Sequence, residues 1–520
     1  METFEIVIAL VLAGAALTAL SRRIGAPYPA TAALVGAVIA MLPGAPEIVL
    51  DPELALTLFV APLLIDAAFD ASPRDLRASW RAVSGLAVGA VVLTVAAVAI
   101  VVRALVPSMP WAAAIALGAI VAPPDAAAAT TVLRQLRPPH RILVVLEGES
   151  LFNDASAILV YRLAIGAALA GSLTLESVIP MLLVVSVGSV VLGLVLARAV
   201  LWLTARIEDV ALAVVVQFGV TFGVWMLAER LHLSGILALV VFAMAYARRA
   251  GDVIPARVRV PSYAVWELAV FVLTVLAFTL VGLQLNAIVG RMSASLLIEH
   301  VGIATAVCVA TIAARIVWVS AAALVQRRGG RRAFALSPRA AALVGWCGMR
   351  GITTLAVALA LPAGGHGEPA FPYRDLILFC AFGVVLGTLV VQGLTLGPLA
   401  RALRLEDDGE VERETALARV ATLRAAIAAT DAYRGGELAE LLRRRFEVML
   451  SRVEHGARSA GEHHDSVVVR AAIDAERRRL LALRADGTIG DAAFQRVERE
   501  LDLEELHLEP LAPVIDSRLG

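Results

Sequence analysis

Long apolar stretches separated by short polar connections fill the first four hundred residues of the chain. Because thirteen of these stretches have the length of a helix and an apolar character that suits a bilayer, we predict thirteen membrane-spanning helices. The predicted spans are residues 4–20, 28–43, 54–70, 82–106, 111–133, 142–170, 178–204, 209–229, 233–248, 264–289, 297–325, 339–362 and 374–402. The pattern therefore predicts an all-α polytopic membrane protein.

Arginine placement gives this membrane protein a predicted orientation, because basic residues in short loops stay on the cytoplasmic side. Every second loop is rich in arginine, and the loops between them contain few. The rich loops carry Arg22 and Arg23; Arg74, Arg77 and Arg81; Arg134, Arg137 and Arg141; Arg206; Arg248, Arg249, Arg257 and Arg259; and Arg327, Arg328, Arg331, Arg332 and Arg339. We expect the N-terminus outside and the C-terminus in the cytoplasm. The first span lacks the positively charged start of a cleaved signal peptide, so we expect it to be retained.

Composition supports the membrane assignment and marks a boundary near residue 403. Hydrophobic residues make up 59% of the chain, and the mean hydropathy is +0.82. Residues 404–520 contain 18 arginines against 24 acidic residues, with leucines spaced three and four apart beside the charges. This pattern favours amphipathic helices. We therefore expect a transmembrane domain at 1–403 and a helical cytoplasmic tail at 404–520, which packs or regulates but does not catalyse.

Polar side chains gather in the sixth predicted span, where uncompensated charge is costly. On a helix, Ser150 and Asp154 share one face, and Glu149 and Asn153 share the neighbouring face. Carboxylate, amide and hydroxyl oxygens are the ligands that a small alkali cation prefers. The alternative is a polar helix interface held together by hydrogen bonds. Two acids in one cluster exceed what such an interface needs, so we favour an ion site.

A second carboxylate, Asp125, directly follows Pro123 and Pro124 in the fifth span. Two prolines within a span free backbone carbonyls and restrict the preceding residues, so we expect an unwound segment here. Asp125 then either completes the ion site or caps the second half of the helix, and the two roles are compatible.

The twelfth span contains a similar interruption, in which three glycines surround Arg350. Spans five and twelve lie seven apart, as two six-helix repeats around a central helix would place them. Broken helices at matching positions of two halves indicate a binding site near the membrane midplane. Arg315 is a lone charge in the eleventh span and requires a carboxylate partner, for which Glu149 is the best candidate.

Four segments resemble signature motifs of the monovalent cation/proton antiporters, the family of bacterial NhaP-type and eukaryotic sodium/proton exchangers. They are residues 149–154 (ESLFND), 278–285 (FTLVGLQL), 345–351 (GWCGMRG) and 391–396 (VQGLTL). The resemblance covers roughly residues 5–405 and implies a homodimer of thirteen-helix protomers. Each protomer would have a dimerisation domain and a six-helix core that carries the ion by an elevator-like movement.

The resemblance also implies roles for individual residues. Asp154 would carry the cation and the proton, with Asn153 and Ser150 as helpers, while Asp125 and the adjacent backbone of Pro124 would complete the Na⁺ site. Glu149 and Arg315 would form a supporting ion pair, and Arg350 would stabilise the unwound crossing. Asp66 in the third span would line a cytoplasmic funnel. Its alternative role is a helix-end charge near Asp70 and Arg74.

The predicted function is exchange of Na⁺, or Li⁺, for H⁺ in a bacterial inner membrane, with a role in pH homeostasis. Electrogenic relatives carry two aspartates where this chain has Asn153 and Asp154, so we predict electroneutral exchange. Relatives often read Thr-Asp-Pro where this chain has Pro124, Asp125 and Ala126, so their ion preference does not transfer.

Two alternative functions stay open. One is K⁺/H⁺ exchange, and the other is a cation channel or pH sensor with the tail as its output. We expect no cofactor and no nucleic acid partner. The expected partners are the lipid bilayer and the transported ions.

Overall fold

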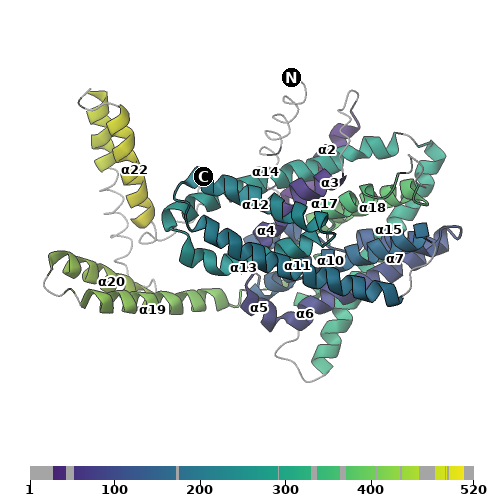
Figure 1. The fold of residues 1–520 in the computed structure, drawn as a ribbon, viewed down its shortest axis with the longest axis horizontal. Helices are drawn as coiled ribbons and strands as arrows, with labels where there is room; N and C mark the ends of the chain where they lie inside the picture. The colour runs from purple at the N-terminus through teal and green to yellow at the C-terminus, as the bar shows by residue number, and fades with distance from the viewer. Residues whose placement is uncertain are drawn as a thin grey trace. The chain divides into compact units, whose positions relative to one another are not determined.

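The computed structural model describes residues 27–42, 52–136, 138–170, 175–290, 292–328, 337–363, 370–405, 407–431, 433, 436–455, 475–486, 488 and 491–508, together with Gly14 and Ser21. The chain divides into two compact units, Met1–Asp408 and Gly409–Gly520 (Figure 1). Apart from Gly14, the predicted span 4–20 lies outside the described residues.

Within its described residues, the first unit is built from helices alone. They are α2 (Tyr28–Ala40), α3 (Pro52–Ala55), η1 (Leu56–Val60), α4 (Ala61–Asp70), α5 (Pro73–Ala78), α6 (Trp80–Ser84), η2 (Gly85–Ala90), α7 (Val91–Leu105), α8 (Trp111–Val121), α9 (Ala126–Leu136), α10 (His140–Ala170), α11 (Leu175–Thr204), α12 (Val210–Arg230), α13 (Gly235–Val253), α14 (Ala256–Val289), α15 (Ala294–Arg328), α16 (Pro338–Trp346), α17 (Ile352–Leu359) and α18 (Arg374–Leu403). Several of these helices continue from one to the next without a loop, as α3, η1 and α4 do.

Seven stretches among the described residues are long and apolar enough to cross a membrane. They are Trp80–Leu105, Trp111–Arg134, Leu183–Thr204, Val210–Arg230, Ala256–Asn286, Ala294–Gln326 and Arg374–Leu403. The 31-residue helix α10 is long enough but is not among them. It carries Glu147, Glu149 and Asp154, whose charges lower its hydropathy although the helix lies inside the bundle. The total of thirteen spans stays a prediction.

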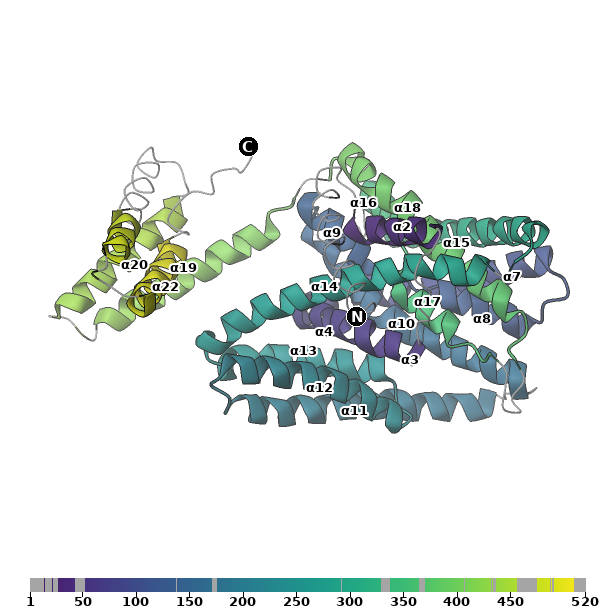
Figure 2. The same ribbon diagram turned by 90° about the horizontal axis from the view of Figure 1, so that it is seen from above.

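The helices of the first unit pack in two groups, which Figure 2 shows from above. In one group α11, α12 and α13 lie side by side, and α13 packs against α4. In the other group α8, α7, α15 and α18 pack in succession, with α10 against α8 and α17 against α18. Helix α14 packs against α2, and α2 reaches α18. The interrupted helices α8–α9 and α16–α17 therefore belong to the same group.

Small residues let α2 and α14 approach at backbone distance. A Cβ atom added to Gly36 would lie 2.2 Å from the carbonyl oxygen of Thr279, and one added to Gly282 would lie 2.2 Å from that of Ala33. Membrane helices associate through such close packing because lipid provides no hydrophobic driving force between them.

The second unit contains α19 (Glu410–Asp431), α20 (Glu437–His455), a helix over 475–485 and α22 (Asp491–Leu508). Helices α19 and α20 pack together, and Arg424 forms an ion pair with Glu454 at 2.7 Å. Leu480, Phe494 and Leu501 form a small buried cluster. Helix α19 ends at Asp431 and α20 begins at Glu437, and the helix over 475–485 ends at Ala485.

Candidate functional site

The first chain interruption lies between α8 and α9 and spans residues 122–125. Pro123 and Pro124 have no amide proton, so they cannot continue the hydrogen-bond pattern of α8. Asp125 begins the next helix: its Oδ1 accepts a hydrogen bond from the amide of Ala127 at 2.9 Å. Asp125 thus caps α9, which leaves its second carboxylate oxygen for another partner.

The second interruption, residues 347–351 between α16 and α17, lies directly against the first. The amide of Asp125 donates to the carbonyl of Met349 at 2.8 Å. A Cβ atom added to Gly351 would lie 1.8 Å from Oδ2 of Asp125. The carboxylate therefore occupies the space that any larger residue at position 351 would need.

Arg350 belongs to the second interruption, and its side chain joins it to the first. Its Nε donates to the carbonyl of Val121, the last residue of α8, at 2.6 Å, and its guanidinium also bonds to the carbonyl of Gly348. Its own amide donates to Oγ1 of Thr388 on α18 at 3.0 Å. A cation at the end of a helix satisfies its free carbonyls and complements its dipole.

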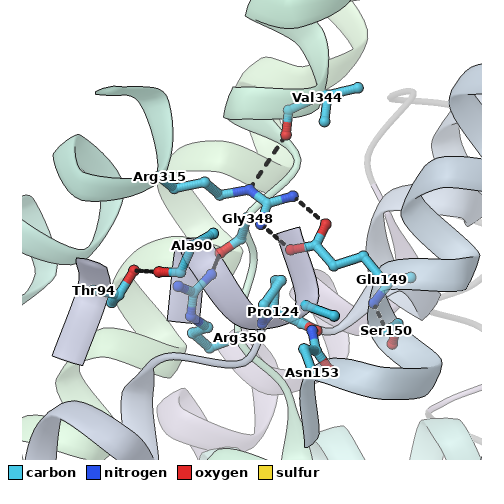
Figure 3. Close-up of polar contacts among 12 residues, drawn as sticks. Ala90, Thr94, Pro124, Glu149, Ser150, Asn153, Arg315, Val344, Gly348 and Arg350 are labelled. Atoms are coloured by element: carbon cyan, nitrogen blue, oxygen red, sulfur yellow. Dashed lines mark hydrogen bonds and ion pairs between the residues drawn. The ribbon is translucent and has the colours of Figure 1, made fainter. Parts of the chain in front are cut away.

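Helix α10 reaches the first interruption through two side chains of its polar cluster. Nδ2 of Asn153 donates to the carbonyl of Pro124 at 3.1 Å, and Oγ of Ser150 accepts from the amide of Ala126 at 3.4 Å (Figure 3). Because the carbonyl of Pro124 can only accept, the amide nitrogen of Asn153 must face it. Oδ1 of Asn153 is then left buried, with no hydrogen-bond partner in the part of the chain that the structure describes.

Asp154 lines a cavity of about 240 Å³ together with Asp125, Ser150 and Pro124. The side chain is 6% exposed, and no described residue donates a hydrogen bond to its carboxylate. Burying a carboxylate without hydrogen bonds is costly, so its charge requires a proton or a cation as partner. The cavity thus brings the carboxylates of Asp125 and Asp154 together with neutral oxygens.

The same cavity continues to Asp66 on α4, and then to Asp70, Arg134 and Glu147. The side chains of Asp70 and Arg134 are 58% and 59% exposed, so they lie at the open end of the cavity. Asp66 therefore lines the same cavity as Asp154.

Glu149 turns away from this cavity towards Arg315 of α15. Both oxygens of Glu149 accept from the guanidinium, at 2.5 and 2.8 Å, and Nε of Arg315 donates to the carbonyl of Val344 on α16 (Figure 3). The two side chains are 1% and 2% exposed. This bidentate pair fixes α10 to α15 and α16 and neutralises two charges inside the membrane part.

The structure thus brings Asp125, Ser150, Asn153 and Asp154 together around the first interruption, with Pro124 between them. Sequence reasoning missed Thr354 of α17, which lines the same cavity, and also Tyr28, Thr130 and Thr131. Threonine is common in membrane helices, and its spacing gave no sign that these residues line one cavity with the carboxylates.

Buried carboxylates beside two interrupted helices, in a bundle with several apolar spans, define a secondary transporter of ions. The family model described as "Sodium/hydrogen exchanger, transmembrane" matches residues 7–402. The chain belongs to this family: it is a multi-pass monovalent cation/proton antiporter and not an enzyme. The predictions of the family and of an all-helical membrane protein are confirmed.

Relatives and solved structures agree with this assignment. The Na⁺/H⁺ antiporter NhaP of Pseudomonas aeruginosa is 30% identical over 68% of this chain and 81% of its own. A Mycobacterium tuberculosis protein described as an uncharacterized Na⁺/H⁺ exchanger is 29% identical over 97% of this chain and 96% of its own. A sodium, potassium, lithium and rubidium/H⁺ antiporter of Bacillus pumilus is 29% identical over 76% of this chain and 61% of its own. The fold resembles that of the sodium proton antiporter MjNhaP1 of Methanocaldococcus jannaschii, with a TM-score of 0.61 at 16% identity over 78% of this chain and 99% of that one.

Proposed function

We propose that this antiporter exchanges one Na⁺ or Li⁺ for one H⁺ at Asp154, in a bacterial inner membrane. The observation that carries the proposal is the cavity that Asp154 lines together with Asp125, Ser150 and Pro124. Carboxylate, hydroxyl and backbone carbonyl oxygens suit a small alkali cation. Nitrogen and sulfur ligands are absent from the described lining of this cavity.

Exchange follows from competition for one buried carboxylate. Asp154 has no hydrogen-bond donor among the described residues, so a proton and a cation are alternative ways to neutralise it. If only the neutralised carrier crosses the membrane, uptake of one ion requires release of the other. Asn153 beside it cannot ionise, which supports electroneutral one-for-one exchange.

Two cavities support alternating access. A second cavity, of about 910 Å³, is lined by Leu54, Leu56, Thr57 and Leu58 of α3 and η1, by Tyr161 and Arg162 of α10 and by Val357 of α17. The first cavity is lined by neighbouring parts of the same stretches of chain, within Val60–Asp70, Glu147–Asp154 and Gly351–Thr354. Between the two sets lie the buried residues Phe59, Ala157, Leu355 and Ala356. A sliding movement of one helix group against the other would open the ion site to each cavity in turn.

We further assign α8–α9 and α16–α17 to the crossing helices of two inverted six-helix repeats. The two interruptions meet through Asp125, Met349 and Gly351, as a site at the interface of two repeats requires. The family resemblance supports a homodimer. The alternation of arginine-rich loops supports an outer N-terminus and a cytoplasmic C-terminus.

K⁺/H⁺ exchange is the second candidate. It is supported by the Bacillus pumilus relative, whose name includes potassium and rubidium. Sodium and potassium use the same oxygen ligands, and Pro124 replaces a threonine that relatives often carry.

A proteoliposome assay with a trapped pH dye distinguishes these functions. We expect Na⁺ and Li⁺ to collapse an imposed pH gradient and K⁺ to be much less effective, at rates that do not change when the membrane potential is clamped at different values. A larger response to K⁺ than to Na⁺ would favour the second candidate. Rates that scale with the clamped potential would rule out one-for-one exchange, and cation entry without proton movement would indicate a channel.

A further inference from the structure

The hydroxyl of Thr354 in α17 is buried and has no hydrogen-bond partner among the described residues. The residue is 1% exposed, and it lines the 240 Å³ cavity with Asp125 and Asp154. Leaving a buried hydroxyl unpaired costs about 1–3 kcal/mol, so an orphan of this kind calls for an explanation.

The chain interruption explains why this hydroxyl is free. Several other buried threonines of the bundle donate to the carbonyl four residues earlier in their own helix. Thr311 donates to Val307 at 2.8 Å, and Thr279 donates to Val275 at 2.8 Å. The corresponding residue for Thr354 is Arg350, which lies before the first turn of α17, in the non-helical connection. No helical carbonyl is placed to accept from Thr354.

The position of α17 places Thr354 beside the ion site, in the lining of the same cavity. Gly351, the residue that precedes α17, touches the carboxylate of Asp125, and Thr354 follows it by one helical turn. The first interruption has Pro124 directly before Asp125, so it offers no hydroxyl at that point. The second interruption supplies one instead.

We propose that Thr354 is a ligand for the transported alkali cation, provided by the second interruption, and that it sets cation affinity and preference. This rests on the proposed function of the cavity. A hydroxyl oxygen adds a neutral ligand beside the carboxylates Asp125 and Asp154, so it strengthens cation binding without adding a titratable group. Its removal should weaken cation binding and leave the proton-carrying carboxylate in place.

The test compares Thr354→Val with Thr311→Val, a matched control whose hydroxyl is buried but bonded within its own helix. Na⁺, Li⁺ and K⁺ are titrated in the proteoliposome assay, and Na⁺ binding to the purified full-length protein is measured by calorimetry. For Thr354→Val we expect about a tenfold higher half-saturating Na⁺ concentration, which corresponds to about 1.4 kcal/mol. We also expect a changed ratio of Na⁺ to K⁺ affinity and a maximal rate within about twofold of wild type.

Unchanged affinities for all three cations in Thr354→Val would overturn the proposal, and so would an equal loss in Thr311→Val. If Thr354→Val does not fold, the pair Thr354→Ser and Thr354→Ala replaces it, because these variants differ by a single oxygen. The serine should then bind Na⁺ more tightly than the alanine, and equal binding would contradict the proposal. Calorimetry measures Na⁺ binding directly and does not depend on transport. If the wild-type protein bound Na⁺ but moved no protons, antiport would be refuted, while the comparison of Na⁺ affinities would still test the role of Thr354.

Discussion

At the residue scale, Gly351 lies directly against the carboxylate of Asp125. The backbone φ of Gly351 is −122°, which any residue can adopt, so only the neighbouring carboxylate excludes a side chain. We expect Gly351→Ala to displace Asp125 and to lower the transport rate at least about tenfold, as small misplacements in preorganised sites do. Gly223→Ala is the control, because nothing lies within 4 Å of its added methyl group. Wild-type transport in Gly351→Ala would show that Asp125 has no fixed place in the site.

The Glu149–Arg315 pair gives a second prediction at this scale. Removing one partner leaves the other charge buried, so Arg315→Leu and Glu149→Leu should each destabilise the protein by about 3–5 kcal/mol. The double variant should recover much of this loss, because no unpaired charge remains. Reversible unfolding in mixed detergent micelles measures the three variants. Additive losses in the double variant would mean that the two side chains do not depend on each other.

At the scale of elements, the crossing of α2 and α14 depends on Gly36 and Gly282. A methyl group at either position would meet a backbone carbonyl at 2.2 Å, and backbone cannot move aside as a flexible side chain can. Gly282→Ala should therefore destabilise the protein by about 1–3 kcal/mol, as overpacking does. Gly302→Ala on α15, where the added atom meets open space, should leave stability unchanged in the same unfolding assay. Similar stability of the two variants would refute close packing at this crossing.

The elements themselves follow closely from the hydrophobic pattern, because bilayer thickness and helical rise leave little choice of length. Where an observed helix end differs from the end of the predicted span, backbone hydrogen bonding extends the helix past the apolar stretch. Helix α14 begins at Ala256, eight residues before the predicted span, and α13 continues to Val253 through Arg248 and Arg249. Hydropathy detects the membrane boundary, and these polar turns lie beyond it.

The candidate site was less accessible to sequence reasoning than the elements. Proline and glycine indicated the interruptions, and charge indicated Asp125 and Asp154. Thr354 carries no such signal, since its importance depends on the missing carbonyl four residues earlier and on contact between two segments more than two hundred residues apart. Such long-range contacts follow from the packing of helices and not from spacing along one of them.

At the scale of the whole molecule, the two compact units suggest that transport belongs to the first. Every residue that lines either cavity precedes Asp408. A variant that ends at Asp408 should therefore retain cation-dependent proton movement in proteoliposomes, with the same half-saturating Na⁺ concentration. A shift of its pH profile would assign a regulatory role to the tail, and an unchanged profile would remove that role. Complete loss of transport in a folded truncated protein would contradict the division.

The central claim is that Asp154 carries both ions, and coupled flux tests it most directly. Radioactive Na⁺ uptake into proteoliposomes, driven only by an outward proton gradient, is measured for wild type and Asp154→Asn while internal pH is recorded. We predict Na⁺ accumulation in wild type, matched by an equal proton efflux, and no flux of either ion in the variant, because asparagine cannot exchange a proton for a cation. Accumulation of Na⁺ by Asp154→Asn, or Na⁺ entry into wild-type vesicles without proton efflux, would contradict the account.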